Sequence, residues 1–206
     1  MNFLLDSGAH SLYTKYVIKE KHKNNYNFYS TDIFYDFVDR YIKFIIKYKK
    51  YINNFVGVDV IFNPEKTLEI QEYIEKKYNI RPMPVIHYGE DLKYIDLYIN
   101  KGYEYIGVGG LGQEVSKRQY FNWADLLFKK ICDKKGIPKI KTHGFAMTSV
   151  DLMIRYPWHS VDSSSWLKLS AYGKIFMPKY KKGKYQWLET PAAICISNKS
   201  YEIIAI

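Results

Sequence analysis

The sequence predicts an α/β fold in which parallel strands alternate with helices. Two observations support this prediction. Short apolar runs bounded by Gly, Pro or polar residues recur along the chain, and longer segments with helical periodicity separate them. Such a pattern suits either an open doubly wound sheet or a (β/α) barrel. The length of 206 residues favours a single domain over residues 1–206. A barrel of that length would be compact or trimmed, because a full eight-fold barrel takes about 250 residues.

The apolar runs predict the strands. They are short and rich in β-branched and aromatic residues, as expected of strands that are buried on both faces. The predicted strands cover residues 2–6, 55–62, 83–88, 103–109, 137–144 and 158–162.

The intervening segments predict helices with recognisable ends. Asn63 stands at a capping position with Pro64 in the first turn, and Gly102 and Gly136 stand where helices stop. The predicted helices cover residues 31–52, 63–79, 91–102, 122–136 and 148–157.

The alternation ends after Asp162. The stretch "GKIFMPKYKKGKYQW" (173–187) predicts a basic β-hairpin that turns near Lys182 and Gly183, and "AAICIS" (192–197) and "YEIIAI" (201–206) predict closing strands. The C-terminal part is therefore expected to differ from the repeating βα units before it.

The charge balance favours an anionic polymer as partner. The chain has 31 Lys+Arg against 21 Asp+Glu, a net charge of +10, and a basic surface of that size most simply binds nucleic acid. A lysine-rich solvated surface encoded by an A/T-rich genome is the alternative.

Two cysteines supply no disulfide framework, and no run reaches the ~18 apolar residues of a membrane span. We therefore expect a cytoplasmic protein without a membrane partner.

Polar residues stand at the carboxyl ends of the predicted strands, where parallel α/β folds collect their chemistry. They are Asp6, Asp59, His87, His143 and Asp162. A lone Asp at a strand end is more often a helix cap. Three Asp and two His at one rim are hard to explain as caps, since burying them unpaired is costly.

Gly107, Gly109 and Gly112 have the spacing G-x-G-x-x-G of a dinucleotide-binding loop. That loop belongs after the first strand, however, and here it follows the fourth, while Asp133 at the acidic position lies in a predicted helix. We therefore expect no cofactor, and read Gly109 and Gly110 as a place where the backbone approaches a flat ligand. A metal-dependent barrel hydrolase using His87, His143, His159 and the aspartates is an alternative, although the chain has no H-x-H or H-E-x-x-H motif.

Several of these stretches together resemble the tRNA-guanine transglycosylase superfamily over roughly residues 2–166. "LLDSGAHS", "GYEYIGVGGLGQE" and "HSVDSSSW" resemble the family's acid/base, glycine-loop and nucleophile motifs in the same order, and "VIHYGE" stands where the family has I-[VQ]-Q-G-S. The short phage branch that inserts 7-deazaguanines into DNA is most similar. The zinc-binding subdomain of the tRNA enzymes is absent, and the glycine loop is one residue shorter.

The resemblance implies a TIM-like (β/α) barrel without the zinc subdomain, and assigns roles to its residues. Asp162 would be the nucleophile that forms a covalent sugar intermediate, Asp6 the acid/base, and Asp59 the acceptor for a guanine-type base. The carboxylates of Asp6 and Asp162 would face one cavity and lie about 5 Å apart, as in retaining glycosidases. The other residues implied to contact the base are His87, Tyr88, Gly109, Gly110, Leu111, His143 and Gly144.

The polymer would be held beyond the nucleophile. Trp158 or Trp166 could stack on a neighbouring base, and the phosphates would meet Lys168, Lys174, Lys179, Lys181, Lys182 and Lys184. Absence of the zinc subdomain favours DNA over tRNA, with a free 7-deazaguanine as second substrate and no metal or cofactor. The same exchange on tRNA and a non-catalytic nucleic-acid-binding barrel remain alternatives. A phage-encoded chain would act in the host cytoplasm, and the sequence leaves the oligomeric state open.

Overall fold

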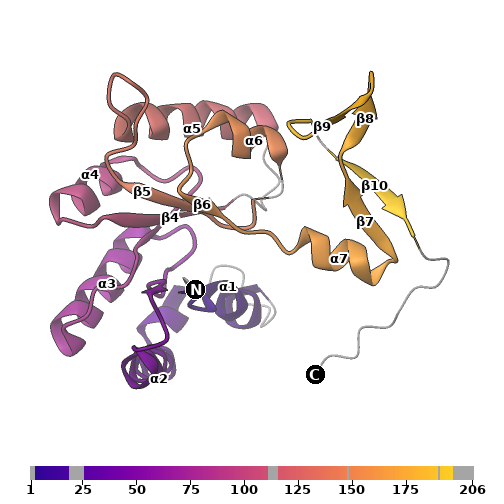
Figure 1. Ribbon diagram of the computed structural model, residues 1–206. Coiled ribbons are helices and arrows are strands. Elements are labelled where there is room, and N and C mark those ends of the chain that lie inside the picture. The colour runs from indigo at the N-terminus through magenta and orange to yellow at the C-terminus, as the bar shows by residue number, and fades with distance from the viewer. Residues whose placement is uncertain (1–2, 19–25, 111–115, 148, 190, 197–206) are drawn as a thin grey trace. The chain divides into compact units, whose positions relative to one another are not determined.

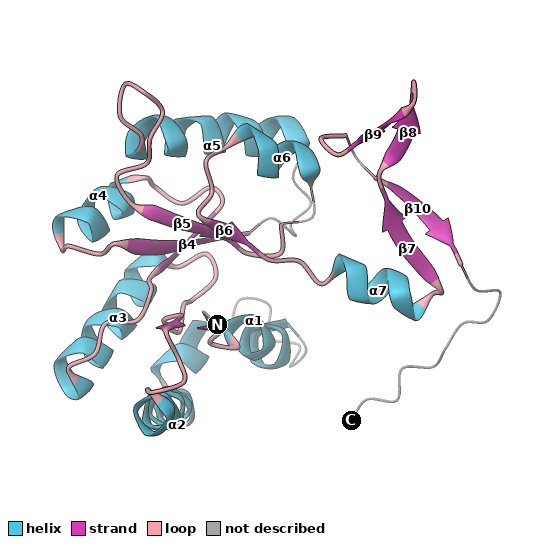
Figure 2. Ribbon diagram, viewed as in Figure 1, coloured by secondary structure: helices cyan, strands magenta, loops and turns pink. Residues whose placement is uncertain are grey.

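A computed structural model describes residues 3–18, 26–110, 116–147, 149–189 and 191–196. The fold is mixed α/β with parallel strands, as predicted (Figures 1 and 2). The chain divides into two compact units, Met1–Gly110 and Leu111–Ile206, and each is described by itself. Among the described residues, every helix is either too short or too polar to cross a membrane.

The first unit contains two pairs of parallel strands. β1 (Leu4–Leu5) pairs with β2 (Asn54–Phe55), and β3 (Val85–His87) pairs with β4 (Tyr105–Gly109). A parallel bridge between Val56 and Met83 joins the two pairs. Strands therefore form within the predicted segments 2–6, 83–88 and 103–109, and at the start of 55–62. Segments that follow one another in the sequence lie side by side, as expected of βαβ units.

Two helices of this unit, α2 (Asp32–Tyr48) and α3 (Pro64–Tyr78), begin where the sequence predicts, whereas the helical segments between residues 9 and 30 were not predicted. In α2 the side chain of Thr31 accepts a hydrogen bond from the Phe34 N–H, and in α3 Asn63 caps Lys66 in the same way. These side chains satisfy backbone donors that the first helical turn leaves open. α4 (Lys93–Asn100) follows β3, and the short α1 (Ala9–Leu12) continues into a π-helical segment, Tyr13–Ile18, before a 3-10 helix at Tyr26–Ser30.

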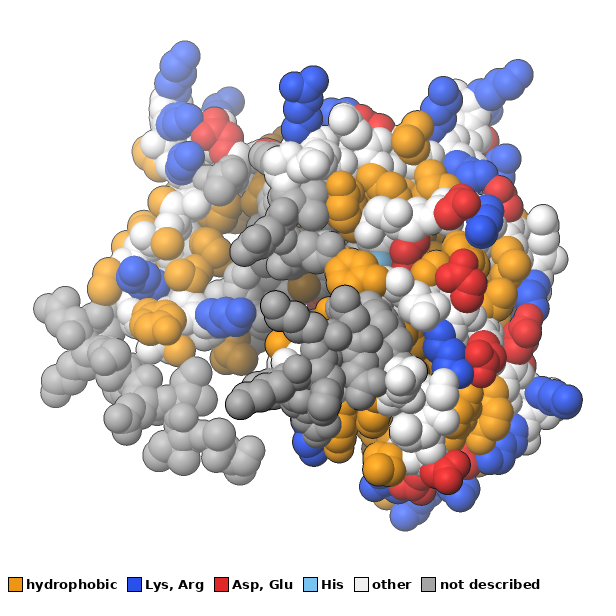
Figure 3. Space-filling view, turned by 180° about the vertical axis from the view of Figure 1, so that it is seen from behind, with side chains coloured by type: hydrophobic (Ala, Val, Ile, Leu, Met, Phe, Trp, Pro, Cys, Tyr) orange, Lys and Arg blue, Asp and Glu red, His pale blue; other side chains and the backbone are white. Residues whose placement is uncertain are grey.

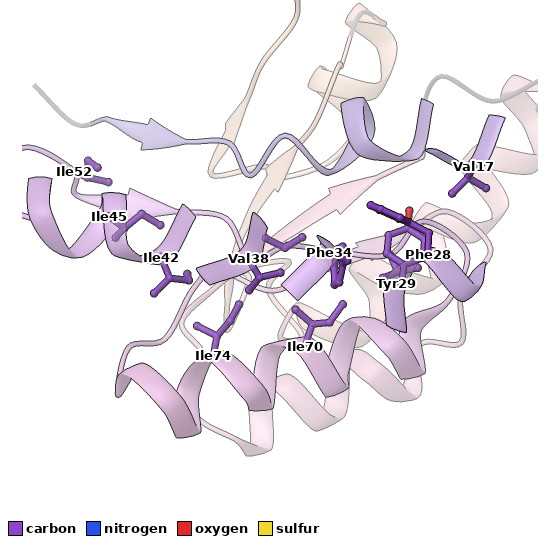
Figure 4. Packing of buried hydrophobic residues seen from close by; sticks show 12 residues of the cluster. Val17, Phe28, Tyr29, Phe34, Val38, Ile42, Ile45, Ile52, Ile70 and Ile74 are labelled. Atoms are coloured by element: carbon purple, nitrogen blue, oxygen red, sulfur yellow. The ribbon is translucent and has the colours of Figure 1, made fainter. Parts of the chain in front are cut away.

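The core of the first unit lies between α2 and α3. Figure 4 shows apolar side chains of the two helices pointing toward one another. The buried positions of α2 follow the helical repeat and are Phe34, Val38, Ile42 and Ile45. Ile70 and Ile74 face them from α3, and each of the six side chains is at most 1% exposed. Burial of such side chains stabilises the fold by about 1.5–3 kcal/mol each.

The predicted strand 55–62 forms only in its first half. Gly57 N donates to Met83 O at 2.8 Å, and beyond it the Val60 N–H finds the Thr67 hydroxyl of α3 at 2.9 Å instead of a neighbouring strand. Phe62 then takes a φ of 65°, which turns the chain into α3. The extended segment that carries Asp59 is thus held by a helix side chain, and Val58 and Val60 are buried at 2% and 0% exposure.

In the second unit β5 (Lys141–Gly144) and β6 (Ser160–Val161) run parallel, with His143 opposite Ser160. α6 (Val150–Arg155) connects them. α5 (Lys117–Ile131) starts earlier than the predicted residue 122, because Ser116 and Gln119 form a reciprocal capping box.

The predicted basic hairpin is confirmed. β8 (Lys179–Lys181) and β9 (Lys184–Gln186) are joined by a two-residue turn in which Lys182 and Gly183 have φ values of 49° and 78°. Two positive φ values match the right-handed twist of a hairpin. Beside it, β7 (Lys174–Met177) pairs antiparallel with β10 (Ala192–Cys195), so the predicted strand 192–197 is also confirmed in its described part. α7 (Ser165–Ala171) was not predicted, and the predicted strand 201–206 lies outside the described residues.

Candidate functional site

A buried ionic triad, Asp59, His87 and Glu90, lies at the carboxyl end of the sheet in the first unit. His87 Nε2 is 3.0 Å from Asp59 Oδ2, and His87 Nδ1 is 3.1 Å from Glu90 Oε1. The three side chains are between 5% and 10% exposed, so the two carboxylates and the ring are largely removed from water. Charges at that depth are tolerated only when they are paired.

The triad raises the pKa of His87 to about 10. Burial alone would favour the neutral ring, but hydrogen bonds to Asp59 and Glu90 and their charges outweigh that effect. At neutral pH the ring is therefore protonated, so that it can donate to Asp59 at one nitrogen and to Glu90 at the other. The pairing uses Asp59 Oδ2 and leaves Oδ1 as an acceptor.

Glu90 reaches His87 through a tight turn. Gly89 adopts a φ of 85°, Glu90 N donates to His87 O at 3.1 Å, and Glu90 Oε2 accepts from His87 N at 2.9 Å. The carboxylate thus holds both the ring and the backbone of His87. Sequence reasoning missed Glu90, although Gly-Glu directly after "VIHY" indicates a turn that returns an acid to the strand end.

The packing around His87 explains Gly109. Gly109 lies opposite His87 in the β3–β4 register, and a Cβ at this position would stand 3.0 Å from His87 Cδ2 and 3.3 Å from Nε2. The glycine therefore leaves room for the imidazole ring. Tyr88 N donates to Gly109 O, and Gly110 has a φ of 86° that favours glycine. Leu111 lies outside the described residues.

Asp6 lies at the end of β1 and lines an open pocket of about 590 Å³ with α1 and α2 residues. Its side chain is exposed, and Oδ1 accepts from Ser7 N at 2.7 Å. Tyr41 of α2 lines the same pocket and donates to Val56 O at 2.7 Å. Burial, and then the charges of Asp6 and Asp59, raise the pKa of the Tyr41 hydroxyl. A neutral hydroxyl therefore lies within the field of both carboxylates.

In the second unit, Asp162 follows β6 and is held at one oxygen. Ala146 N donates to Asp162 Oδ1 at 2.6 Å, and His143 Nε2 lies 3.8 Å from the same atom. Ala146 has a φ of 52°, a conformation uncommon for alanine, and this turn aims its N–H at the carboxylate. The Asp162 side chain is 59% exposed, whereas His143 is buried and contacts Ser160 Oγ through Nδ1 at 2.6 Å.

The remaining residues of the second unit are packed differently. A Cβ at Gly144 would meet Met147, Val161 and Trp158, so this glycine is required by packing. Trp158 donates to Leu152 O and packs edge-on against Phe128, with ring centroids 4.8 Å apart, which indicates a structural role. The side chain of Trp166 lies outside the described part of the chain.

The lysines predicted to bind phosphates are all exposed: Lys168, Lys174, Lys179, Lys181, Lys182 and Lys184. In Figure 3 the blue lysine side chains stand out around the tip of the hairpin at the upper left. Lys181 is paired within the chain, because its Nζ lies 2.8 Å from Glu189 Oε2. The other hairpin lysines make no ion pair among the described residues.

The predicted site residues thus form two groups. Asp6, Asp59, His87, Tyr88, Gly109 and Gly110 belong to the first unit, and His143, Gly144 and Asp162 to the second. Across the described ranges, no three His, Cys, Asp or Glu side chains converge as metal ligands, and His87 offers no open ring nitrogen. Comparisons of the chain with models of protein families, with curated proteins and with solved structures found no match.

Proposed function

We propose that this chain is a base-exchange transglycosylase built on a compact TIM-like (β/α) barrel. It would replace guanine in nucleic acid, with DNA favoured over tRNA, by a free 7-deazaguanine. The observation that carries the proposal is the buried triad, in which the His87 ring contacts Asp59 Oδ2 at 3.0 Å and so fixes the carboxylate group near the ends of parallel strands. Asp6 at the end of β1 and Asp162 at the end of β6 further support the proposal.

The triad suits a guanine-type base. Such a base presents a ring N–H and an exocyclic amine side by side, and both donate hydrogen bonds. Asp59 offers them a carboxylate whose Oδ2 is fixed by His87 and whose Oδ1 remains an acceptor. A base without these donors would bury Asp59 Oδ1 without a hydrogen-bond donor, which is the kind of penalty that gives strong discrimination. Glu90 acts here as a positioning residue, because it contacts His87 and not the base.

Asp162 suits the role of nucleophile. Its Oδ1 is occupied by the Ala146 N–H, so Oδ2 is the oxygen that would attack C1′ of the sugar. The C1′–O bond forms as the C1′–N9 bond to guanine breaks. In the second half of the exchange, N9 of the incoming base attacks C1′ and the C1′–O bond breaks, so that the Asp162 carboxylate is regenerated.

Asp6 would handle the proton. It would give its proton to the departing guanine and then accept the N9 proton of the incoming base, so that each turnover restores both carboxyl groups. Its exposed position beside an open pocket supports exchange of free bases there.

The test is a base-exchange assay. The purified chain is incubated with guanine-containing DNA, or with tRNA, together with radiolabelled 7-deazaguanines, and label in the polymer is counted. We expect DNA to gain label, and the Asp162→Asn variant to give none. Labelling of tRNA alone would assign the exchange to RNA. If neither polymer gains label under conditions in which both bind, the proposed chemistry is wrong.

A further inference from the structure

The β8–β9 hairpin has two chemically different faces. Tyr180 lies opposite Tyr185 in the register, and Trp187 follows on the same side, with ring centroids 5.0 Å apart for the tyrosine pair and 5.9 Å for Tyr185 and Trp187. The alternate positions belong to the opposite face, since side chains alternate along a strand. They pair Lys179 with Gln186 and Lys181 with Lys184.

The aromatic face is open to solvent. Tyr180, Tyr185 and Trp187 are 65%, 51% and 73% exposed. The rings contact one another, so they form a continuous platform. Aromatic side chains usually stabilise a fold by being buried, and a contiguous exposed set marks an interaction surface.

The charges around the platform identify the partner. Four lysines, Lys179, Lys181, Lys182 and Lys184, lie within the hairpin, and Glu189 is the acid that pairs with one of them. An apolar protein partner would leave these cations unmatched. A strand of nucleic acid matches both faces, because its bases stack on aromatic rings while its phosphates meet lysines.

We infer that this hairpin is a stacking platform for unpaired bases of single-stranded nucleic acid. In a duplex each base is already stacked on both sides, so its ring faces are not available to Tyr185 or Trp187. The inference deepens the proposed function, because it assigns the form in which the polymer is held. It also fits an exchange reaction in which the target base must leave its stack.

The test measures binding without any exchange chemistry. A fluorescein-labelled 20-mer of mixed sequence is titrated as single-stranded DNA, as single-stranded RNA and as duplex DNA, over a series of salt concentrations. Trp187→Ala and Tyr185→Ala should each raise the Kd for the single strands by about 5- to 150-fold and leave the salt dependence unchanged. Lys182→Gln should instead lower the salt slope by about 0.7, the amount expected for one lost phosphate contact.

Matched variants separate stacking from misfolding. Tyr51→Ala removes a tyrosine that is also 65% exposed but lies in the first unit, and should leave the Kd unchanged. Trp187→Phe keeps an aromatic face and should retain most of the affinity. Unchanged Kd values for both Trp187→Ala and Tyr185→Ala, or equal affinity for the duplex, would overturn the inference. If binding follows the expected pattern but no polymer gains a new base, the platform stands and the transglycosylase proposal fails.

Discussion

His87 Nε2 lies 3.0 Å from Asp59 Oδ2, in a place where the two side chains are only 5% and 10% exposed. Glu90 holds the opposite edge of the ring at 3.1 Å. One buried ring thus contacts two acidic side chains, so removing it would take away a side-chain partner of the buried Asp59. Breaking a buried ion pair typically costs about 3–5 kcal/mol. The arrangement makes His87 the group that holds Asp59 in place.

The first prediction concerns the charge of His87. Its pKa is raised from 6.5 to about 10 in the folded protein. The stability that comes from this shift is fully present below pH 6.5 and is lost as the pH rises toward 10. In that window the free energy of unfolding should fall by up to about 1.4 kcal/mol per pH unit. NMR of the ring nitrogens at pH 7.5 should show both of them protonated.

The variant Glu90→Gln tests whether the acidic neighbours of His87 cause its raised pKa. The variant keeps the shape of the side chain but removes one anion, so the pKa of His87 should drop and the fall in stability should begin at lower pH. Glu72→Gln is a matched control, because Glu72 is half exposed and pairs with Lys101 instead. A neutral His87 ring at pH 7.5 in the parent protein would contradict this account of the triad.

The second prediction concerns Gly109. An alanine methyl at this position would lie 3.0 Å from His87 Cδ2, so the ring must shift away from Asp59. We expect Gly109→Ala to lower the free energy of unfolding by about 1–3 kcal/mol, the usual cost of overpacking. The pKa of His87 should fall with it. Gly136→Ala in the second unit adds backbone strain at a φ of 78° and should leave the pKa of His87 unchanged.

The parts of the fold that could be predicted depend on local signals. Asn63 and Pro64 fix the start of α3, and Lys182-Gly183 fixes the hairpin turn, because each acts on its own backbone. The predicted strand through Val58 and Val60 failed in its second half for a non-local reason. Its apolar alternation is genuine, but Thr67 of α3 takes the hydrogen bond that a neighbouring strand would have made.

The candidate site also combines features that local sequence predicts with features that depend on residues distant in the sequence. The polar strand ends Asp59 and His87 could be found from sequence, since residues after apolar runs gather at one edge of a parallel sheet. Their direct contact could not, because it depends on side-chain geometry across two strands. The role of Gly109 as space for the His87 ring was missed for that reason, and so was the Ala146 N–H that holds Asp162.

The third prediction concerns Glu189. Its carboxylate pairs with Lys181 at 2.8 Å and so competes with any phosphate for that lysine. Glu189→Gln should free Lys181, tighten single-strand binding by up to about fivefold and increase the salt slope by up to about 0.7. Glu72→Gln changes the net charge equally, but far along the chain, and should have little effect. If both variants tighten binding alike, general charge and not the hairpin governs affinity.

The fourth prediction concerns Asp6. Asp6→Ala removes the proposed acid/base group from the end of β1, and should slow base exchange by about 10²- to 10⁴-fold. Binding of the polymer should be unchanged, since Asp6 is not proposed to contact phosphates. Single-turnover exchange and anisotropy measure the two quantities separately. Asp36→Asn removes another exposed carboxylate of the first unit and serves as control. A variant that loses both activities together would indicate a structural role.

The last prediction concerns the covalent step. A carboxylate nucleophile keeps the strand on the protein until an incoming base releases it, so an adduct should be trapped when no free base is supplied. Denaturing electrophoresis of the chain with labelled DNA should show the adduct, and its disappearance on addition of a 7-deazaguanine. Asp162→Asn should abolish both the adduct and exchange, because the amide lacks the attacking charge.

The variant Asp162→Asn should remove the attacking charge without disturbing the local structure. In Asp162→Asn the side-chain oxygen can still accept from Ala146 N, now 2.6 Å from Asp162 Oδ1, so the turn after β5 should persist and the melting temperature should change little. Asp162→Ala removes that acceptor and should cost about 1 kcal/mol, the usual value of a capping hydrogen bond. If Asp162→Asn exchanges bases at a rate near that of the parent, the carboxylate serves only to hold Ala146. Asp162 would then be a structural cap, and the proposed mechanism would be wrong.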